Sequence, residues 1–188
     1  MNSVRKSPPV RMTREEFLDW AGTRNSGKYE RIDGVVVSMP PKRLSHSARK
    51  SRIYNAFQNA IDRAGLPCEA YVDGPTVSVE DCDFVPDVVV RCGPPLEDGL
   101  VIPDPLVVVE VLSPNTPAID LGRKRASYFL VPSLQHYLAV WASRREVHLH
   151  SRAADTVRAT IVEDGQITFD PPGISIALDE IYLGGPIS

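Results

Sequence analysis

Two carboxylates lie in segments of the sequence that are otherwise strongly apolar. Glu110 interrupts the run LVVVEVL (106–112), and Asp87 comes directly before three valines in FVPDVVV (84–90). An ionised carboxylate buried without a partner costs several kcal/mol, so each needs a cation, from the protein or as a bound metal ion. Because side chains alternate along a strand, the two carboxylates can converge if their strands are neighbours and their faces coincide. Such oxygen donors suit Mg²⁺, with the backbone carbonyl of Val111 as a further ligand.

Each of these acids also has an ordinary structural interpretation. Asp87 can form an Asx turn, and Glu110 can belong to a buried ion pair. A third acid, Glu30, lies in the segment YERIDG and can be a surface residue paired with Arg31 or Lys28. The residues alone leave both interpretations open for all three acids.

Lys124 is the cation that the sequence offers to this group. It lies on a predicted helix that follows the Glu110 strand, one turn after Asp120 and on the same helical face. It can simply pair with Asp120, which is worth a few tenths of a kcal/mol. Alternatively, it reaches a metal site, where it positions a water or stabilises developing negative charge.

The elements that must position these residues begin with two helices and a hairpin. Thr13 and Glu16 fit a capping box, which predicts a helix from 13 to 21. Asp33-Gly34 predicts a hairpin turn. A long amphipathic helix follows, with Ser45 or Ser47 as its cap and Gly65 at its end.

Strands dominate the rest of the chain. We expect strands at 69–79, broken at 73–75, at 84–92 and at 106–113, the last buried on both faces. A helix from about 119 to 130 comes next. Hairpins around 143–145 and on Asp164-Gly165 complete the order, which predicts an α/β (α+β) sandwich with a mixed sheet.

Composition limits the class of protein. The 188 residues suffice for one domain, which we place at 13–188 behind a flexible arm at 1–12. Apolar residues make up 43% of the chain and no run approaches ~18 of them, which excludes a membrane-spanning segment. Three cysteines spaced 14 and 10 apart argue against a disulfide framework and against structural zinc, and make the cytoplasm the default location.

The net charge of −3 hides an asymmetry between the two parts of the chain. Residues 1–52 hold 12 Lys and Arg against 5 Asp and Glu, a balance of +7, whereas residues 53–188 hold 9 against 19, a balance of −10. A basic rim can therefore face phosphate while carboxylates gather elsewhere, or the charges can be scattered over a solvated surface. The net charge by itself does not exclude a nuclease.

Several segments in the same order resemble a known family. YERIDGVVVSMPP, SHSARKSRIYNAF, Pro86-Asp87, VVVEVLSPNT and IDLGRKRASYF are similar to the Uma-type family of "putative restriction endonucleases", within the PD-(D/E)xK nuclease superfamily. The resemblance runs from about residue 13 to 183. One departure from the superfamily pattern is Leu112, which stands where the lysine of (D/E)xK would be, so Lys124 of the following helix matches the lysine instead.

The resemblance implies a restriction-endonuclease-like core of order α-β-β-β-α-β, with flanking helices and added hairpins. It implies that Asp87 and Glu110 bind Mg²⁺, with Mn²⁺ as a substitute, and that Glu30 and Lys124 complete a catalytic set. The implied chemistry is hydrolysis of phosphodiester bonds in nucleic acid, DNA in the first place, by a homodimer. Basic residues that could contact phosphates, or simply form a solvated face, are Arg43, Arg49, Lys50, Arg52, Arg123 and Arg125.

The remaining candidate residues give weaker signals. His46 starts the long helix, and we favour a role without catalysis for it. His148 and His150 have the spacing of some metal sites, but an exposed strand face explains them better. Trp20, Trp141, Tyr137 and Tyr128 are expected in the core rather than as base-stacking platforms.

Three functions compete at this stage. The first is a Mg²⁺-dependent nuclease. The second is a nucleic-acid-binding or interaction module on a nuclease scaffold with little or no turnover, favoured by a chain too short for a separate target-recognition domain. The third is a metal hydrolase for a small phosphate ester, which the basic N-terminal half disfavours.

Overall fold

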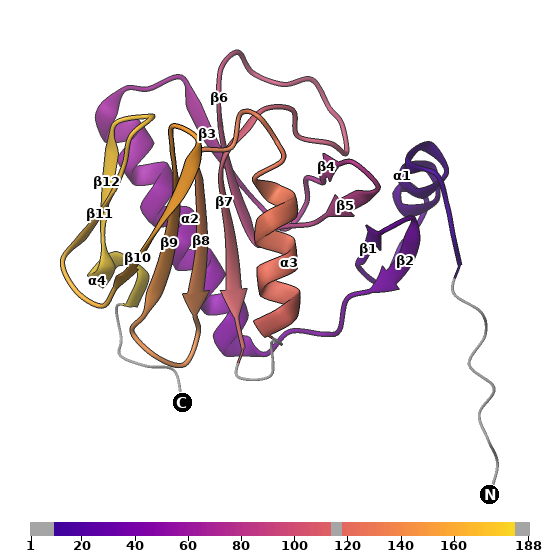
Figure 1. Cartoon of the computed structure of the whole chain (residues 1–188), viewed down its shortest axis with the longest axis horizontal. Helices are drawn as coiled ribbons and strands as arrows, with labels where there is room; N and C mark the ends of the chain where they lie inside the picture. The colour runs from indigo at the N-terminus through magenta and orange to yellow at the C-terminus, as the bar shows by residue number, and fades with distance from the viewer. Residues whose placement is uncertain (1–9, 114–117, 183–188) are drawn as a thin grey trace, which may run out of the picture.

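The computed structural model describes residues 10–113 and 118–182 (Figure 1). Helices and strands in it follow the order expected from the hydrophobic patterns. Their bounds are α1 (Arg14–Gly22), β1 (Tyr29–Ile32), β2 (Val35–Ser38), α2 (Leu44–Ala64), β3 (Cys68–Val72), β4 (Val77–Val79), β5 (Cys82–Phe84), β6 (Val88–Cys92), β7 (Pro105–Leu112), α3 (Ala118–Tyr128), β8 (His136–Trp141), β9 (Val147–Ala153), β10 (Thr156–Val162), β11 (Gln166–Phe169), β12 (Ile174–Ala177) and α4 (Leu178–Tyr182).

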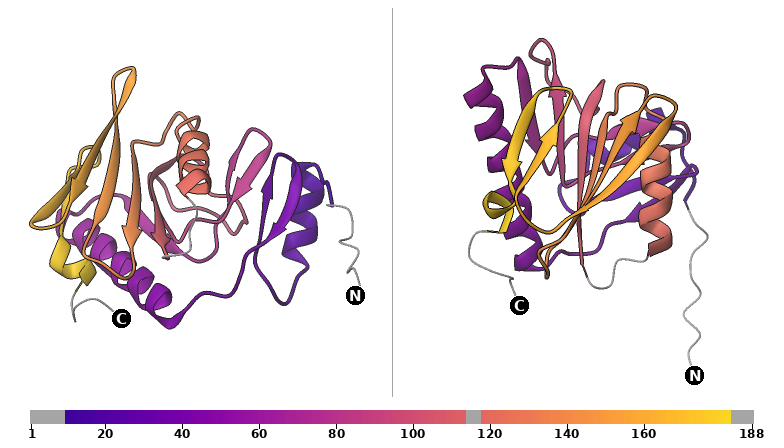
Figure 2. Two further views of the ribbon diagram at one scale, coloured as in Figure 1. Left: turned by 60° about the horizontal axis from the view of Figure 1, so that its bottom comes forward. Right: turned by 60° about the vertical axis from the view of Figure 1, so that its left-hand side comes forward.

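A six-stranded sheet of order β10-β9-β8-β7-β6-β3 forms the centre of the molecule. β7 runs parallel to β8 and antiparallel to β6, so the sheet is mixed, as the sequence predicted. A smaller sheet of order β2-β1-β5-β4 and a hairpin of β11 and β12 lie beside it. Figure 2 shows the small sheet with α1 at one end of the molecule and the β9–β10 hairpin at the other.

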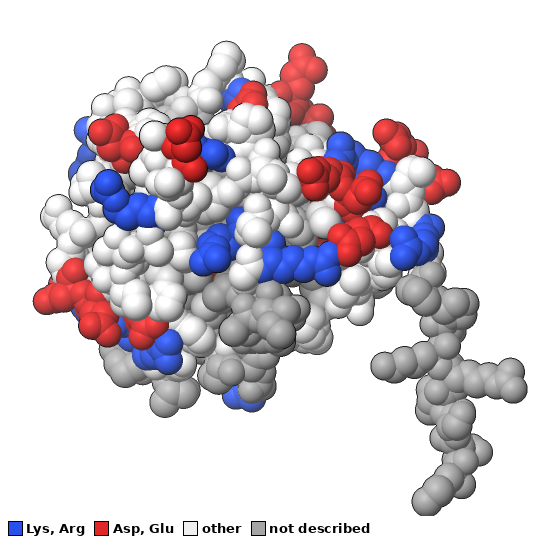
Figure 3. All heavy atoms as spheres, viewed as in Figure 1, with Lys and Arg blue, Asp and Glu red and all other residues white. Residues whose placement is uncertain are grey.

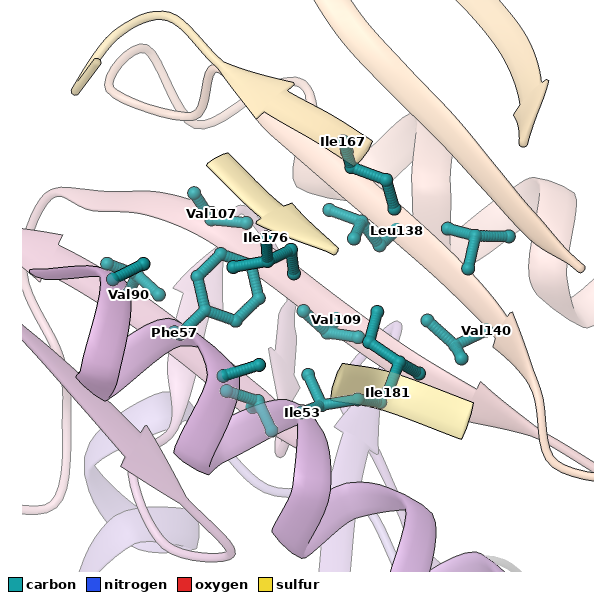
Figure 4. Packing of buried hydrophobic residues seen from close by; sticks show 14 of the residues in the cluster. Ile53, Phe57, Val90, Val107, Val109, Leu138, Val140, Ile167, Ile176 and Ile181 are labelled. Atoms are coloured by element: carbon teal, nitrogen blue, oxygen red, sulfur yellow. The ribbon is translucent and has the colours of Figure 1, made fainter. Parts of the chain in front are cut away.

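The central sheet is covered on both faces. Val107, Val109 and Val111 of β7 belong to a core cluster with Ile53 and Phe57 of α2, as Figure 4 shows for four of them. The alternate residues Val108 and Leu112 belong to a second cluster, with Tyr128 of α3 and Phe84 of β5. β7 is therefore buried on both faces, which explains its run of valines.

Most predicted elements are confirmed. Thr13 and Glu16 form the capping box of α1. The chain turns at Asp33-Gly34 between β1 and β2, and Gly65 ends α2 in the left-handed conformation, with φ of 61°.

Three local predictions are wrong. The cap of α2 is Arg43 without a side-chain hydrogen bond, because the helix begins shortly after the diproline segment and includes both candidate serines. The strand predicted at 84–92 is two strands in different sheets, separated at Val85-Pro86-Asp87, where proline offers no N–H to a ladder. Asp164-Gly165 joins no hairpin, since β10 pairs with β9 and β11 with β12.

The last residues of the predicted N-terminal arm contact the small sheet. Residues 10–12 are hydrogen-bonded to the β1–β2 hairpin: the Met12 N–H donates to the carbonyl of Gly34, and that of Val36 to the carbonyl of Val10. Residues 1–9 of the arm lie outside the described residues.

The cysteines do include one disulfide. Cys68 and Cys92 stand opposite each other on β3 and β6 and are bonded, while Cys82 is free and buried. Strand register brings them together, and their spacing along the chain could not reveal it. The prediction of a cytoplasmic location loses its premise here and stays a prediction. None of the helices in the described ranges has the length and apolarity to cross a membrane.

The stability of the fold depends on pH through His150. It is buried on β9 beside Tyr137, so it does not lie on the exposed strand face that we expected. Burial, helped by the charges of Arg125 and His148, lowers the pKa of His150 to about 4. A histidine whose pKa is lower in the folded state than its unfolded value of ~6.5 stabilises the folded state at pH values above ~6.5. The protein loses that stabilisation as the pH falls towards 4.

We therefore predict that His150→Gln makes the protein less sensitive to acid. Between pH 7 and 5, the free energy of unfolding should fall by about 1 to 2 kcal/mol less in the variant than in the wild type, because glutamine has no proton to take up. Urea unfolding at both pH values measures this difference. An equal loss in the two proteins would contradict the assignment.

Candidate active site

Asp87 is fixed by hydrogen bonds at the point where β6 begins. Its backbone N–H donates to the carbonyl of Val109 (3.1 Å), and its Oδ2 accepts from the N–H of Val111 (2.8 Å), both on β7. Its Oδ1 lies 2.8 Å from Nε2 of His46. Because the bond from Val111 comes from a neighbouring strand, an Asx turn does not account for this residue. The carboxylate is held at the edge of β7, with only 6% of the residue exposed.

The first turns of α2 supply the groups around Asp87. His46 and Lys50 are four residues apart, so they share a face of the helix. Lys50 Nζ lies 3.8 Å from Asp87 Oδ1 and 2.5 Å from Asp73 Oδ2. Burial alone raises the pKa of Asp87, but the hydrogen bond and charge of His46, with the N–H of Val111, outweigh it and lower the pKa overall. The structure places His46 in contact with Asp87, and the expectation that it has no catalytic role stays a prediction.

Glu110 lies one residue before Val111, on the face of β7 that α3 covers. Its Oε1 accepts hydrogen bonds from Nζ of Lys124 (3.2 Å) and from the hydroxyl of Tyr128 (3.1 Å). Burial raises the pKa of Glu110 to about 7, against the attraction of Lys124, and the negative charges of Asp87 and Glu30 add to the rise. The ion pair that the sequence allowed is thus present, in a group of interacting carboxylates.

Lys124 connects Glu110 to Glu30. Its Nζ lies 2.7 Å from Oε1 of Glu30, which also accepts the N–H of Val85 (3.1 Å). Burial alone lowers the pKa of Lys124, but the two carboxylates outweigh it, so the pKa lies above its usual value and the amine is charged. Three of the four predicted catalytic residues therefore form one hydrogen-bonded cluster.

Glu30 does not form the surface pair that its neighbours along the chain would allow. Lys28 binds Asp73 and Arg31 binds Asp83, so neither of these cations contacts Glu30. Asp120 is the alternative partner of Lys124 in the sequence, and its side chain lies outside the described residues.

A buried ion pair holds the small sheet that carries Glu30. Arg31 on β1 donates from Nε to Asp83 Oδ2 on β5 (2.5 Å), and both residues are buried. Asp83 Oδ1 also accepts from Ser78 (2.5 Å) and from Arg14 (3.2 Å). Because side chains alternate along β1, Arg31 fixes the strand from one face while Glu30 projects from the other.

The donors near Asp87 fit a hard divalent cation. Asp87 and Glu110 offer carboxylate oxygens, and the carbonyl of Val111 faces the same edge of β7 as its N–H, which binds Asp87. In the described ranges, no group of three or more His, Cys, Asp or Glu side chains gathers as metal ligands do. An ion here would keep several waters, as Mg²⁺ commonly does with one or two carboxylates.

The predicted phosphate contacts fare unevenly. The prediction that Arg49 contacts phosphate is wrong. This residue is fully buried, donates to the carbonyls of Ala142 and Ile181, and lies over the ring of Tyr182. Lys50 is buried, and its ammonium is held between acids. The remaining four reach the surface to different extents: Arg43 and Arg123 are exposed, the latter paired with Asp33, and Arg52 and Arg125 are half-buried.

The sequence reasoning missed two members of the site. Tyr128, expected only as a core residue, is buried and also donates to Glu110. Asp73, in the turn after β3, joins Lys28 and Lys50. The helical spacing held a signal for the first, because Tyr128 lies four residues after Lys124. Asp73 carried no such signal.

Comparisons with known proteins identify relatives of this chain. Residues 14–179 match the model of the Uma2 family, described as "Putative restriction endonuclease". The "Uncharacterized protein slr1290" of Synechocystis sp. is 31% identical over 183 residues, covering 95% of each chain.

A solved structure shares the fold. It is described as a "putative nuclease belonging to DUF820" from Anabaena variabilis, and it superposes with a TM-score of 0.71 at 16% identity, over 92% of this chain and 98% of that one. The predicted fold class is thereby confirmed. On the match over residues 14–179, the chain belongs to the Uma2 family of "putative restriction endonucleases".

Proposed function

We propose that the protein is a Mg²⁺-dependent nuclease that hydrolyses phosphodiester bonds in nucleic acid, with DNA as the substrate. The observation that carries this proposal is the pair of buried carboxylates, Asp87 and Glu110, which β7 brings together beside a charged lysine. Family membership supports the same chemistry.

Each residue has a definite task in this proposal. A divalent ion held by Asp87 and Glu110, with the Val111 carbonyl, would lower the pKa of a water and neutralise charge on the scissile phosphate. His46 and the N–H of Val111 keep the Asp87 carboxylate oriented. Lys124 directs positive charge at the reacting phosphate, and Glu30 holds the lysine in place.

The decisive test removes one carboxylate charge at a time. Asp87→Asn and Glu110→Gln should each lower the cleavage rate of plasmid and oligonucleotide substrates at least about a hundredfold with Mg²⁺ or Mn²⁺, because the ion loses a ligand. Matched controls are Asp98→Asn and Glu97→Gln, the same exchanges at exposed loop positions. Far-ultraviolet circular dichroism checks that all four variants are folded.

The alternatives correspond to different outcomes of this assay. Metal-dependent cleavage that survives both active-site substitutions would overturn the proposal. Salt-dependent binding without cleavage by the wild type would favour an interaction module on a nuclease scaffold. Turnover of a small phosphate ester alone would favour the third function.

We also propose that two copies associate through the edge strand β10. Val157 and Ile161 on this strand are 42% and 61% exposed, and β10 ends the central sheet opposite β3. An antiparallel pair of β10 strands centred on Ala159 would place Val157 against Ile161 of the partner subunit. An exposed edge with apolar side chains is a template for such pairing, and a two-fold axis lets the same strand of each copy meet.

Ile161→Lys should therefore raise the dissociation constant of the dimer at least about tenfold, because the two-fold symmetry places two lysine charges in the interface. Sedimentation velocity over a concentration series measures this. Leu130→Lys, at a position 55% exposed in the turn after α3, is the matched control. A monomeric wild type, or a dimer indifferent to Ile161→Lys, would refute the proposed interface.

A further inference from the structure

A cavity of about 520 Å³ has Asp87 in its wall, and its lining does not include Lys124. Its walls come from the segments before β1 and after β2, the first turns of α2, and the turn after β3. Asp87 is the member of the proposed catalytic set that lines it. The charged residues of the lining are Arg24, Lys28, Lys42, Lys50, Asp73 and Asp87.

The charge of this lining is opposite to that of the whole chain. Four cations face two carboxylates, a local balance of +2 in a protein of net charge −3. On the face that Figure 3 shows, basic and acidic side chains lie close to one another at several places. A small anionic ligand is therefore attracted to the cavity more than to the surface as a whole.

Three of the four cations are also held in place. Asp73 accepts from Lys50 Nζ (2.5 Å) and from Lys28, so one carboxylate anchors two lysines in the wall. The guanidinium of Arg24 lies 4.4 Å from the centre of the Trp20 ring. Lys42 is exposed, and its charge contributes to the lowered pKa of Asp87. Positioned cations lose less side-chain entropy when they bind phosphate.

The size of the cavity selects among anionic ligands. A volume of 520 Å³ corresponds to a cube about 8 Å on a side. The major groove of B-DNA alone is ~12 Å wide, so a base-paired duplex cannot enter. A volume within the usual range for small-ligand sites, ~300 to 1,000 Å³, suits a single nucleotide with its phosphate.

We propose that this cavity binds one nucleotide of a single-stranded segment, with Lys28, Lys42 and Arg24 contacting its phosphates, and so delivers an unpaired strand to Asp87. The identity of the ligand as nucleic acid rests on the proposed nuclease function. The substrate class, single-stranded or frayed ends rather than intact duplex, is the new element.

The test measures binding apart from cleavage. Fluorescence anisotropy in EDTA gives the dissociation constant for a labelled single strand of about 12 nucleotides and for the same sequence as a blunt duplex. The wild type should bind the single strand at least several-fold more tightly. Lys28→Gln and Lys42→Gln should each weaken that binding about three- to tenfold and reduce the salt slope by ~0.7.

Matched variants keep the result interpretable. Arg63→Gln, at an exposed position near the end of α2 and outside the cavity, removes the same charge and should leave binding unchanged. Lys42 pairs with no acid that the structure describes, so its substitution tests the cavity without disturbing Asp73. Equal effects of all three substitutions, or equal binding of duplex and single strand, would overturn the proposal.

Failure of the catalytic proposal looks different. Asp87→Asn should abolish cleavage yet keep single-strand binding in EDTA, because the cations of the cavity remain. A wild type that binds the single strand selectively but cleaves nothing would refute the nuclease and leave the cavity as a nucleotide site. A wild type that cleaves but binds both forms equally would refute only the cavity.

Discussion

The burial of Glu110 in the middle of β7 is the constraint from which the arrangement of this molecule follows. An ionised carboxylate in a run of valines requires a cation, and the cation comes from α3 as Lys124. Lys124 is itself mostly buried and is held by a second acid, Glu30. Removing the lysine would leave two acids without their partner, a change that costs ~3 to 5 kcal/mol in buried pairs. The proposed catalytic residues are thus also structural.

The same principle explains the uneven charge along the chain. Several cations of the basic N-terminal part are paired with acids from the later part of the chain. Arg31 binds Asp83, and Lys50 binds Asp73, so cations of the first part neutralise acids of the second. Ion pairs across the fold therefore account for part of the charge asymmetry along the chain. A local positive excess lines the cavity beside Asp87, and Arg43 is exposed outside it.

The sequence predicted the fold well wherever a pattern was local. The capping box at Thr13 and the turn at Asp33-Gly34 depend on neighbouring residues, and both are present. β7 was predictable because a strand buried on both faces needs continuous apolar residues. The hairpin predicted at Asp164-Gly165 is absent, since this dipeptide lies in a connection between two sheets. Only the register of β9 with β10 decides the pairing.

The candidate site was likewise predictable only in part. Asp87, Glu110 and Lys124 stood out because charge conflicts with an apolar context or matches a family pattern. The surroundings of His46 and Arg49 could not be predicted in this way, since a histidine or an arginine near a helix start looks the same in sequence whether it faces solvent or core. In the structure His46 contacts Asp87, whereas Arg49 is buried against α4. Long-range packing of α2 on the sheet fixed that difference.

Because the site draws on two sheets, its geometry depends on how they dock. Glu30 comes from the small sheet, whereas Asp87 and Glu110 belong to the central one, and Lys124 joins them. The walls of the cavity likewise come from both parts, since Lys28 borders β1 and Lys50 lies on α2. A shift of the small sheet would therefore alter the lysine and the cavity together. Asp87 is the exception, because its partners His46 and Val111 pack on the central sheet. The Asp87 carboxylate, which the proposed metal site and the cavity share, is thus held by contacts that do not depend on the small sheet.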